Sequence, residues 1–133
     1  FKFLEHTADI MFEAYGKTEK EMFENSAKAM FSIICNIDKV KAKKAVNINL
    51  KADNLKELMF KWLQELIALV DTSQMFFSKF NIEKIDNNGL KAKVYGETMI
   101  PEKGKTVVKA VTYYKFDVVR DKKGYKAVVA LDI

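Results

Sequence analysis

Two stretches of the chain repeat their hydrophobic residues with the period of an α-helix. The first, residues 18–34, begins with a capping-box signature, because Glu21 follows Thr18 at a spacing of three. The second, residues 54–70, begins with the same spacing and has Asn54 as its cap. Each pattern predicts a helix with one broad apolar face. The expected apolar positions are Met22, Phe23, Ser26, Ala27, Met30, Phe31 and Ile34, and then Leu55, Leu58, Met59, Trp62, Leu63, Leu66, Ile67 and Val70.

Most of the remaining chain alternates apolar and polar residues with a period of two. This alternation is typical of antiparallel strands with one buried face. An Asn-Asn-Gly sequence at 87–89 and an Asp-Lys-Lys-Gly sequence at 121–124 predict tight turns between strands. The predicted class is therefore α+β. We expect a single domain over residues 1–133, in which two helices pack on one face of a mostly antiparallel sheet to make a two-layer structure. The expected strands are 2–4, 10–15, 46–51, 76–85, 90–95, 113–119 and 125–132.

The size and composition of the chain favour one domain in a reducing compartment. It has 133 residues, of which 49% are hydrophobic, and this content supports a core without disulfides. The lone cysteine, Cys35, has apolar neighbours in the sequence, so we expect a buried structural thiol. We expect no membrane-spanning helix and no signal peptide, because neither sequence pattern occurs. These features together predict a cytoplasmic protein.

The basic residues favour a solvated surface over a nucleic-acid-reading stripe. The net charge is +5, but Arg120 is the only arginine, and arginine is the usual residue for bidentate contacts to phosphates and bases. The lysines are scattered along the sequence, with one local cluster at residues 39–44. Phe76, Phe77 and Phe80 could stack on bases, although core packing within a strand is the more frequent use. We therefore expect any contact with nucleic acid to be weak or indirect.

The densest group of functional side chains lies near the start of the sequence. His6 is the only histidine, and Asp9 follows it three residues later. Such a pair fits a general base, and it also fits a histidine and a turn-capping acid that hold a loop by hydrogen bonds. The structural interpretation is favoured because no nucleophile accompanies the pair. A metal-dependent enzyme is the least favoured class.

A hard cation fits these residues better than zinc does. One histidine and one cysteine in different elements do not supply the usual zinc ligands, whereas calcium and magnesium accept carboxylates, carbonyls and water. Asp132 is an acid at the end of an otherwise apolar strand. Either the strand has reached solvent there, or Asp132 and Asp9 converge on a cation, helped by a carbonyl or terminal carboxylate of Ile133. Spacing in the sequence does not decide between these alternatives.

Several short sequences, taken in order over essentially the whole chain, resemble the archease family. His-Thr-Ala-Asp and Lys-Ala-Val-Thr-Tyr are specific in combination. The matching segments are 3–10 (FLEHTADI), 14–18 (AYGKT), 21–27 (EMFENSA), 62–66 (WLQEL), 108–113 (VKAVTY) and 131–133 (LDI).

The resemblance implies a non-catalytic role in tRNA splicing. Archeases are cytosolic accessory proteins that promote guanylylation and turnover of the RtcB-type RNA ligase, and some archaeal members are described as chaperones for a tRNA methyltransferase. The family binds a divalent cation, usually calcium, with magnesium as the alternative here. Carried over by position, the metal ligands are Asp9, Asp132 and Ile133.

The same resemblance suggests which residues surround the metal or contact the ligase. We expect His6, Lys109, Thr112 and Tyr113 in these roles. Many members have a histidine where Tyr114 stands, and the effect of this difference stays open. The competing classes are a protein chaperone, which would suppress aggregation without GTP, an RNA-binding module, and the metal-dependent enzyme.

Overall fold

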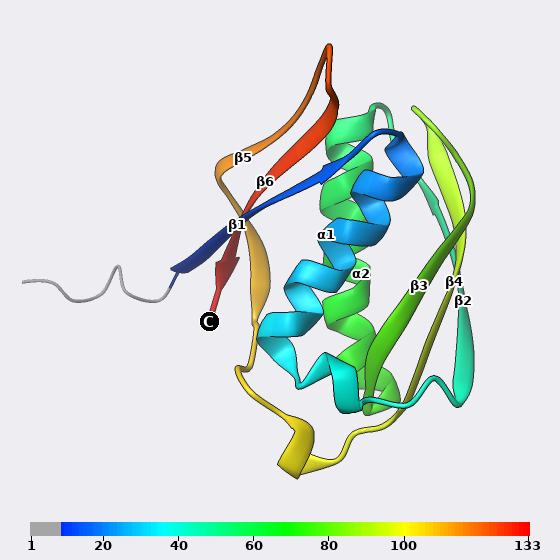
Figure 1. The fold of residues 1–133 in the computed structure, drawn as a ribbon, viewed down its shortest axis with the longest axis vertical. Helices are drawn as coiled ribbons and strands as arrows, with labels where there is room; N and C mark the ends of the chain where they lie inside the picture. The colour runs from blue at the N-terminus through cyan, green and yellow to red at the C-terminus, as the bar shows by residue number, and fades with distance from the viewer. Residues whose placement is uncertain (1–8) are drawn as a thin grey trace, which may run out of the picture.

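Two three-stranded antiparallel sheets enclose a pair of helices in the computed structural model, which describes residues 9–133 (Figure 1). One sheet has the order β1-β6-β5 and the other β2-β4-β3. The predicted α+β class, the two helices and the antiparallel strands are confirmed, while the expected strand at 2–4 lies outside the described residues. In chain order the elements are β1 (Asp9–Gly16), α1 (Glu19–Ile34), η2 (Ile37–Lys39), β2 (Lys44–Lys51), α2 (Leu55–Ser73), β3 (Met75–Asp86), β4 (Gly89–Thr98), η3 (Pro101–Lys103), β5 (Ala110–Asp121) and β6 (Gly124–Asp132).

The division of the strands into two sheets was not predicted. In Figure 1 the β1-β6-β5 sheet lies on one side of the helices and the β2-β4-β3 sheet on the other. Each sheet buries one face against the helices, which accounts for the alternation of apolar and polar residues along strands of both sheets. A period of two reports that one face of a strand is buried, but it does not report which sheet the strand joins.

Helix α1 begins and ends as the sequence predicts. The Thr18 hydroxyl accepts the backbone N–H of Glu21 at 3.1 Å, and the Glu21 carboxylate accepts the N–H of Lys17 at 2.8 Å. The first bond satisfies a donor that the first helical turn leaves without a partner, and the second ties Glu21 back to the residue before the cap. All seven expected core positions of this helix are buried.

Helix α2 lies beside α1 and runs three residues beyond its predicted end. Asn54 caps it by accepting the N–H of Glu57 at 2.8 Å, and Gln74 ends it in the left-handed conformation with φ 53°. The indole of Trp62 donates to the Phe23 carbonyl of α1 at 3.0 Å, which satisfies the only polar atom of this buried ring. Among residues 9–133, no helix is both long and apolar enough to cross a membrane.

The hairpin of β3 and β4 forms at the predicted turn, with Asp86 opposite Gly89. Phe76, Phe77 and Phe80 are buried in the core, as expected for strand residues rather than base-stacking ones. Gly96 lies where β4 passes very close to β3, because a β-carbon there would lie 1.8 Å from the Phe76 carbonyl oxygen. The close approach of the two strands therefore requires glycine at this position.

Strand β5 is interrupted by a wide bulge that shapes the exposed end of its sheet. Thr112 pairs with Ala130 and Asp117 pairs with Val128, so residues 113–116 lie opposite one residue of β6. Lys115 within the bulge has a left-handed backbone with φ 52°. A bulge of this kind redirects the side chains that it carries.

Candidate functional site

Backbone register places the two predicted aspartate ligands side by side. Asp9 opens β1 and Asp132 closes β6, and the antiparallel pairing sets them directly opposite each other. Residues in such a pair point to the same face of the sheet, with their β-carbons about 4.5–5.5 Å apart. Leu131 is fully buried against the helices, so the neighbouring Asp132 and its partner Asp9 project from the outer face. Two carboxylates therefore share one exposed end of the sheet.

Neighbouring strands hold Asp132 from both sides. Strand β6 is the central strand of its sheet, and Asp132 pairs with Asp9 on one side and with Ala110 on the other. The backbone N–H of Lys109 donates to the Asp132 carbonyl at 2.7 Å. Ile133 follows at once, with its side chain half-buried against the core. Because Ile133 directly follows Asp132 in the sequence, its main-chain oxygens lie close to the paired carboxylates.

The side chains described supply only part of a metal site. Within residues 9–133, no group of three or more His, Cys, Asp or Glu side chains is arranged to hold a metal ion. Asp9 and Asp132 offer hard oxygen donors, which suit calcium or magnesium and do not suit zinc. Any remaining ligands would be main-chain oxygens, water or oxygens of a partner. His6 lies outside the described residues.

The paired aspartates are a local concentration of negative charge. In the described part of the chain, neither Asp9 nor Asp132 has a basic side chain within 4.0 Å. Like charges directly opposite each other on a sheet are destabilising. A cation placed between the two carboxylates would remove this repulsion, so the arrangement fits the expected donor set.

The other predicted residues that the structure describes lie just before β5 or on its two faces. Lys109 adjoins Asp132 through its backbone hydrogen bond, and Thr112 lies on the same outer face as Asp132. Tyr113 lies on the helix side, where its ring stacks on Phe60 of α2 with centroids 4.1 Å apart and planes 3° apart. Tyr113 is nevertheless 75% exposed. It is therefore held in place and remains available for contact.

Two residues of α2 that the sequence analysis did not single out support this end of the sheet. The Gln64 side chain accepts the N–H of Val111 at 3.0 Å, and Phe60 contacts Phe116 edge-on as well as stacking on Tyr113. Both α2 residues are only half-buried. In the sequence, Phe60 and Gln64 stand out only as an aromatic and an amide beside the apolar stripe of α2. That position does not indicate which residues of β5 they contact.

Cys35 is a buried core residue, as the sequence predicts. Its side chain is fully buried, and burial raises the pKa of its thiol to about 11. A thiol with a pKa this high is protonated at neutral pH and is therefore a poor nucleophile or metal ligand.

Comparison with known proteins gives one consistent result. The model of the Archease protein family matches residues 1–133. The protein archease of Methanosarcina acetivorans is 40% identical over 139 residues, covering 100% of this chain and 95% of that protein. The protein archease of Pyrococcus furiosus is 37% identical over 121 residues, covering 87% of this chain and 85% of that protein.

Two solved structures share the fold. The solution structure of Methanobacterium thermoautotrophicum protein 1598 is 31% identical, covers 100% of this chain and 96% of its own, and superposes with a TM-score of 0.81. The crystal structure of a Thermotoga maritima archease, described as a possible chaperone, is 22% identical with a TM-score of 0.72 and covers 100% and 97% of the two chains. Both resemblances extend over the whole chain.

Proposed function

This chain belongs to the archease family, and on that premise we propose that it is a non-catalytic activator of an RtcB-type tRNA-splicing RNA ligase. In this proposal it acts in the cytoplasm and promotes guanylylation and turnover of the ligase. The observation that supports the proposal best is the direct register of Asp9 with Asp132 on an exposed face. We propose no catalytic residue in this chain.

Asp9, Asp132 and main-chain oxygens of Ile133 would hold the divalent cation, with calcium as the expected ion and magnesium as the alternative. Calcium takes 6–8 oxygen ligands, so this donor set leaves positions for water or for an oxygen of the ligase. When bound, the ion neutralises two carboxylates that otherwise repel approaching anions. An anionic group of the ligase would then be able to bind at the ion.

The aspartates act in this proposal by favouring one conformation of the ligase. A ligand shifts a conformational equilibrium only by its difference in affinity for the two states. A difference of about 1.4 kcal/mol changes the ratio of the two populations tenfold. In this proposal, a transient contact at the end of the β1-β6-β5 sheet that differs by this amount between the two states raises the ratio of guanylylation-competent to incompetent ligase about tenfold.

A guanylylation assay with purified ligase and GTP tests the proposal. We expect Asp9→Ala and Asp132→Ala to lose most of the stimulation while melting at the temperature of the wild type or above it, since each substitution relieves like-charge repulsion. Asp38→Ala is the matched control, because Asp38 is exposed in η2, away from this sheet. Full stimulation by folded Asp9→Ala and Asp132→Ala variants would defeat the proposal.

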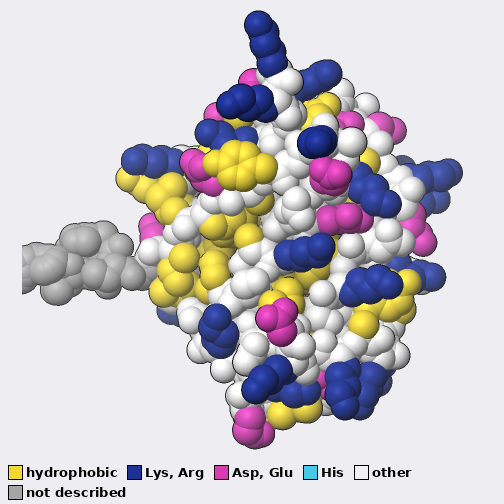
Figure 2. Space-filling model, viewed as in Figure 1, with side chains coloured by type: hydrophobic (Ala, Val, Ile, Leu, Met, Phe, Trp, Pro, Cys, Tyr) yellow, Lys and Arg dark blue, Asp and Glu magenta, His cyan; other side chains and the backbone are white. Residues whose placement is uncertain are grey.

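A protein chaperone for tRNA-modifying enzymes, such as a tRNA methyltransferase, is the second candidate. It is favoured by large hydrophobic side chains that reach solvent, several of them on the β1-β6-β5 side, where Figure 2 shows hydrophobic atoms at the surface. This role predicts suppression of client aggregation that is independent of GTP and of Asp132. These exposed side chains are Met11, Tyr15, Val107, Tyr113, Tyr114 and Val119.

A further inference from the structure

The outer face of the β2-β4-β3 sheet, which points away from the helices, brings together lysines that are far apart in the sequence. Lys91 of the central strand β4 lies directly opposite Lys84 of β3 on one side and Asn49 of β2 on the other. All three residues are exposed. Because directly opposite residues share a face, this row carries two positive charges and an amide side by side.

The next rows along the sheet repeat this pattern. Lys93 lies between Asn47 and Asn81, in the register that follows two residues beyond Lys91. One row further, the Lys79 ammonium lies 5.0 Å from the centre of the Tyr95 ring. Residues two apart on a strand are about 6.6 Å apart. The basic face therefore extends over several rows with regularly spaced lysines, amides and one aromatic ring.

The positive charge of this face is mostly uncompensated. Within residues 9–133, none of Lys79, Lys84, Lys91 and Lys93 has an acidic side chain within 4.0 Å. Two carboxylates lie near the lysines at one end of the face: Glu83 in the β3 bulge and Asp86 at the turn, where Asp86 accepts the N–H of Asn88 at 2.7 Å. Lys84 and Lys91 are like charges in direct opposition, which costs stability unless an anion lies against them.

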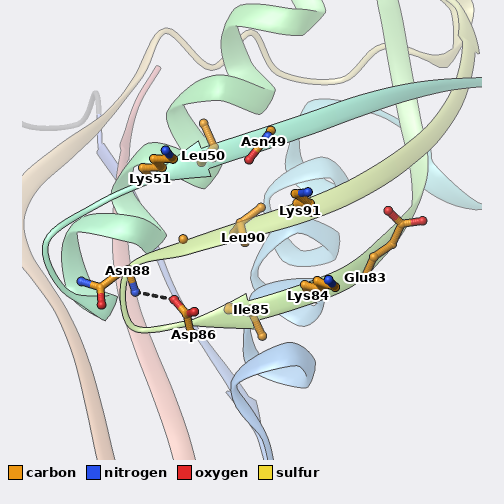
Figure 3. A pocket seen from close by; sticks show the side chains of 11 residues that line it. Asn49, Leu50, Lys51, Glu83, Lys84, Ile85, Asp86, Asn88, Leu90 and Lys91 are labelled. Carbon is orange, nitrogen blue, oxygen red and sulfur yellow. Dashed lines mark hydrogen bonds between the residues drawn. The ribbon is translucent and has the colours of Figure 1, made fainter.

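The same face is hollowed at the end near the β3–β4 turn. An open hollow of about 760 Å³ runs across the three strands, and Figure 3 shows one lysine from each strand along it, together with the carboxylates of Glu83 and Asp86. By contrast, Lys and Arg side chains in the view of Figure 2 are interspersed with Asp and Glu. The residues of the hollow used here are Asn49, Lys51, Lys84 and Lys91.

We propose that this basic face, defined by Lys51, Lys79, Lys84, Lys91 and Lys93, binds the phosphate backbone of RNA. Lysines supply phosphate contacts without base specificity, and the intervening asparagine amides can both donate to and accept from ribose hydroxyls. An acidic protein surface is the competing ligand, and competition with polyglutamate distinguishes it from RNA. Because the lysines contact phosphates and not base edges in this proposal, binding is independent of sequence and sensitive to salt.

The basic face lies on the sheet opposite the one that carries Asp9 and Asp132 (Figure 1). RNA binding therefore leaves the proposed ligase-facing site accessible. The inference goes beyond the proposed ligase activation and stands without it, because RNA affinity is measured on the protein alone. Loss of one activity without the other separates the two proposals.

Fluorescence anisotropy with a labelled single-stranded RNA of about 15 nucleotides tests the inference, since this length spans sites of the known size range. We expect the wild type to bind in the micromolar range near physiological salt and more tightly below it. The double variant Lys91→Gln, Lys93→Gln should bind at least tenfold more weakly at low salt. Its log–log salt slope should be shallower by about 1.4, the value for two lost contacts to single-stranded RNA.

A second double variant, Lys28→Gln with Lys122→Gln, removes the same net charge from α1 and from the β5–β6 turn. It should keep at least half of the wild-type RNA affinity. Equal weakening by both double variants, or no RNA binding by the wild type at low salt, would overturn the inference. Polyglutamate that binds as tightly as the RNA at the same salt would overturn it too, and would assign the face to an acidic protein.

Discussion

At the scale of single residues, the proposed activity depends on side chains whose positions are set by the backbone. Asp9 and Asp132 come from opposite ends of the chain and become neighbours through the antiparallel register of β1 and β6. The stack of Tyr113 on Phe60 likewise joins two distant segments. A long aromatic side chain that is held by a stack and still exposed loses little entropy on binding, which is typical of an interface anchor.

Substituting Tyr113 tests whether the bulge of β5 contacts the ligase. We expect Tyr113→Ala to raise the concentration needed for half-maximal stimulation of guanylylation about tenfold, which corresponds to about 1.4 kcal/mol of binding free energy. The maximal stimulation should be unchanged, because the aspartates are intact. Tyr113→Phe keeps the stack on Phe60 and should behave nearly as the wild type. An unchanged half-maximal concentration for Tyr113→Ala would remove Tyr113 from the interface.

At the scale of elements, local signals predicted the helices and turns, and longer-range contacts decided the rest. The caps Thr18 and Asn54 and the helical period act within a few residues, so both helices begin where the sequence indicates. Helix α2 extends to Ser73, three residues past its predicted end. The sequence did not indicate this end, because the residue in the left-handed conformation is Gln74 and not the usual glycine. The bulge at residues 113–116 and the membership of each strand in its sheet depend on tertiary packing.

Glu97 links three segments at one end of β4, and its titration gives a test at this scale. Its buried carboxylate accepts the Lys103 ammonium at 2.8 Å and the N–H of Lys41 at 2.7 Å. The hydrogen bond from Lys103, followed by that from Lys41, lowers the pKa of Glu97 below its ordinary value of 4.5. A lowered pKa in the folded state stabilises the protein above the pKa of the unfolded chain, and this stabilisation is lost as pH falls through the lower value.

Chemical denaturation between pH 7 and pH 3 should reveal this contribution. The free energy of unfolding of the wild type should fall below about pH 4.5, while that of Glu97→Gln should already be lower at pH 7 and decline less steeply. The control Glu102→Gln lies on an exposed position of η3 and should follow the wild-type profile. Profiles of Glu97→Gln and the wild type that run parallel across this range would contradict the assignment.

At the scale of the whole molecule, the two sheets present different chemistry on opposite sides of the helices (Figure 1). One side carries the paired aspartates and exposed aromatics of the proposed ligase contact, and the other carries the basic face that we propose to bind RNA. Taken together, the two proposals have the molecule hold RNA near the ligase while it acts on the ligase. The lysines appear scattered in the sequence because the basic face draws them from β2, β3 and β4.

The candidate site was only partly predictable from the sequence. The residue types at positions 9 and 132 indicate a hard cation, and the family resemblance supplied the ligand set. Their adjacency could not follow from spacing, because a shift of one residue in the β1–β6 register would send one side chain to the other face. The support from Phe60 and Gln64 was not predictable either, since it depends on how α2 lies against β5.

Calcium titration of the purified protein by calorimetry tests most directly whether Asp9 and Asp132 share one cation. The account predicts one calcium ion per wild-type chain, and a dissociation constant at least tenfold higher for Asp9→Asn and for Asp132→Asn, which keep the side-chain shape and remove a charged ligand. Asp38→Asn should bind as the wild type does. Wild-type calcium affinity in both folded site variants, or no calcium binding by the wild type, would contradict the account.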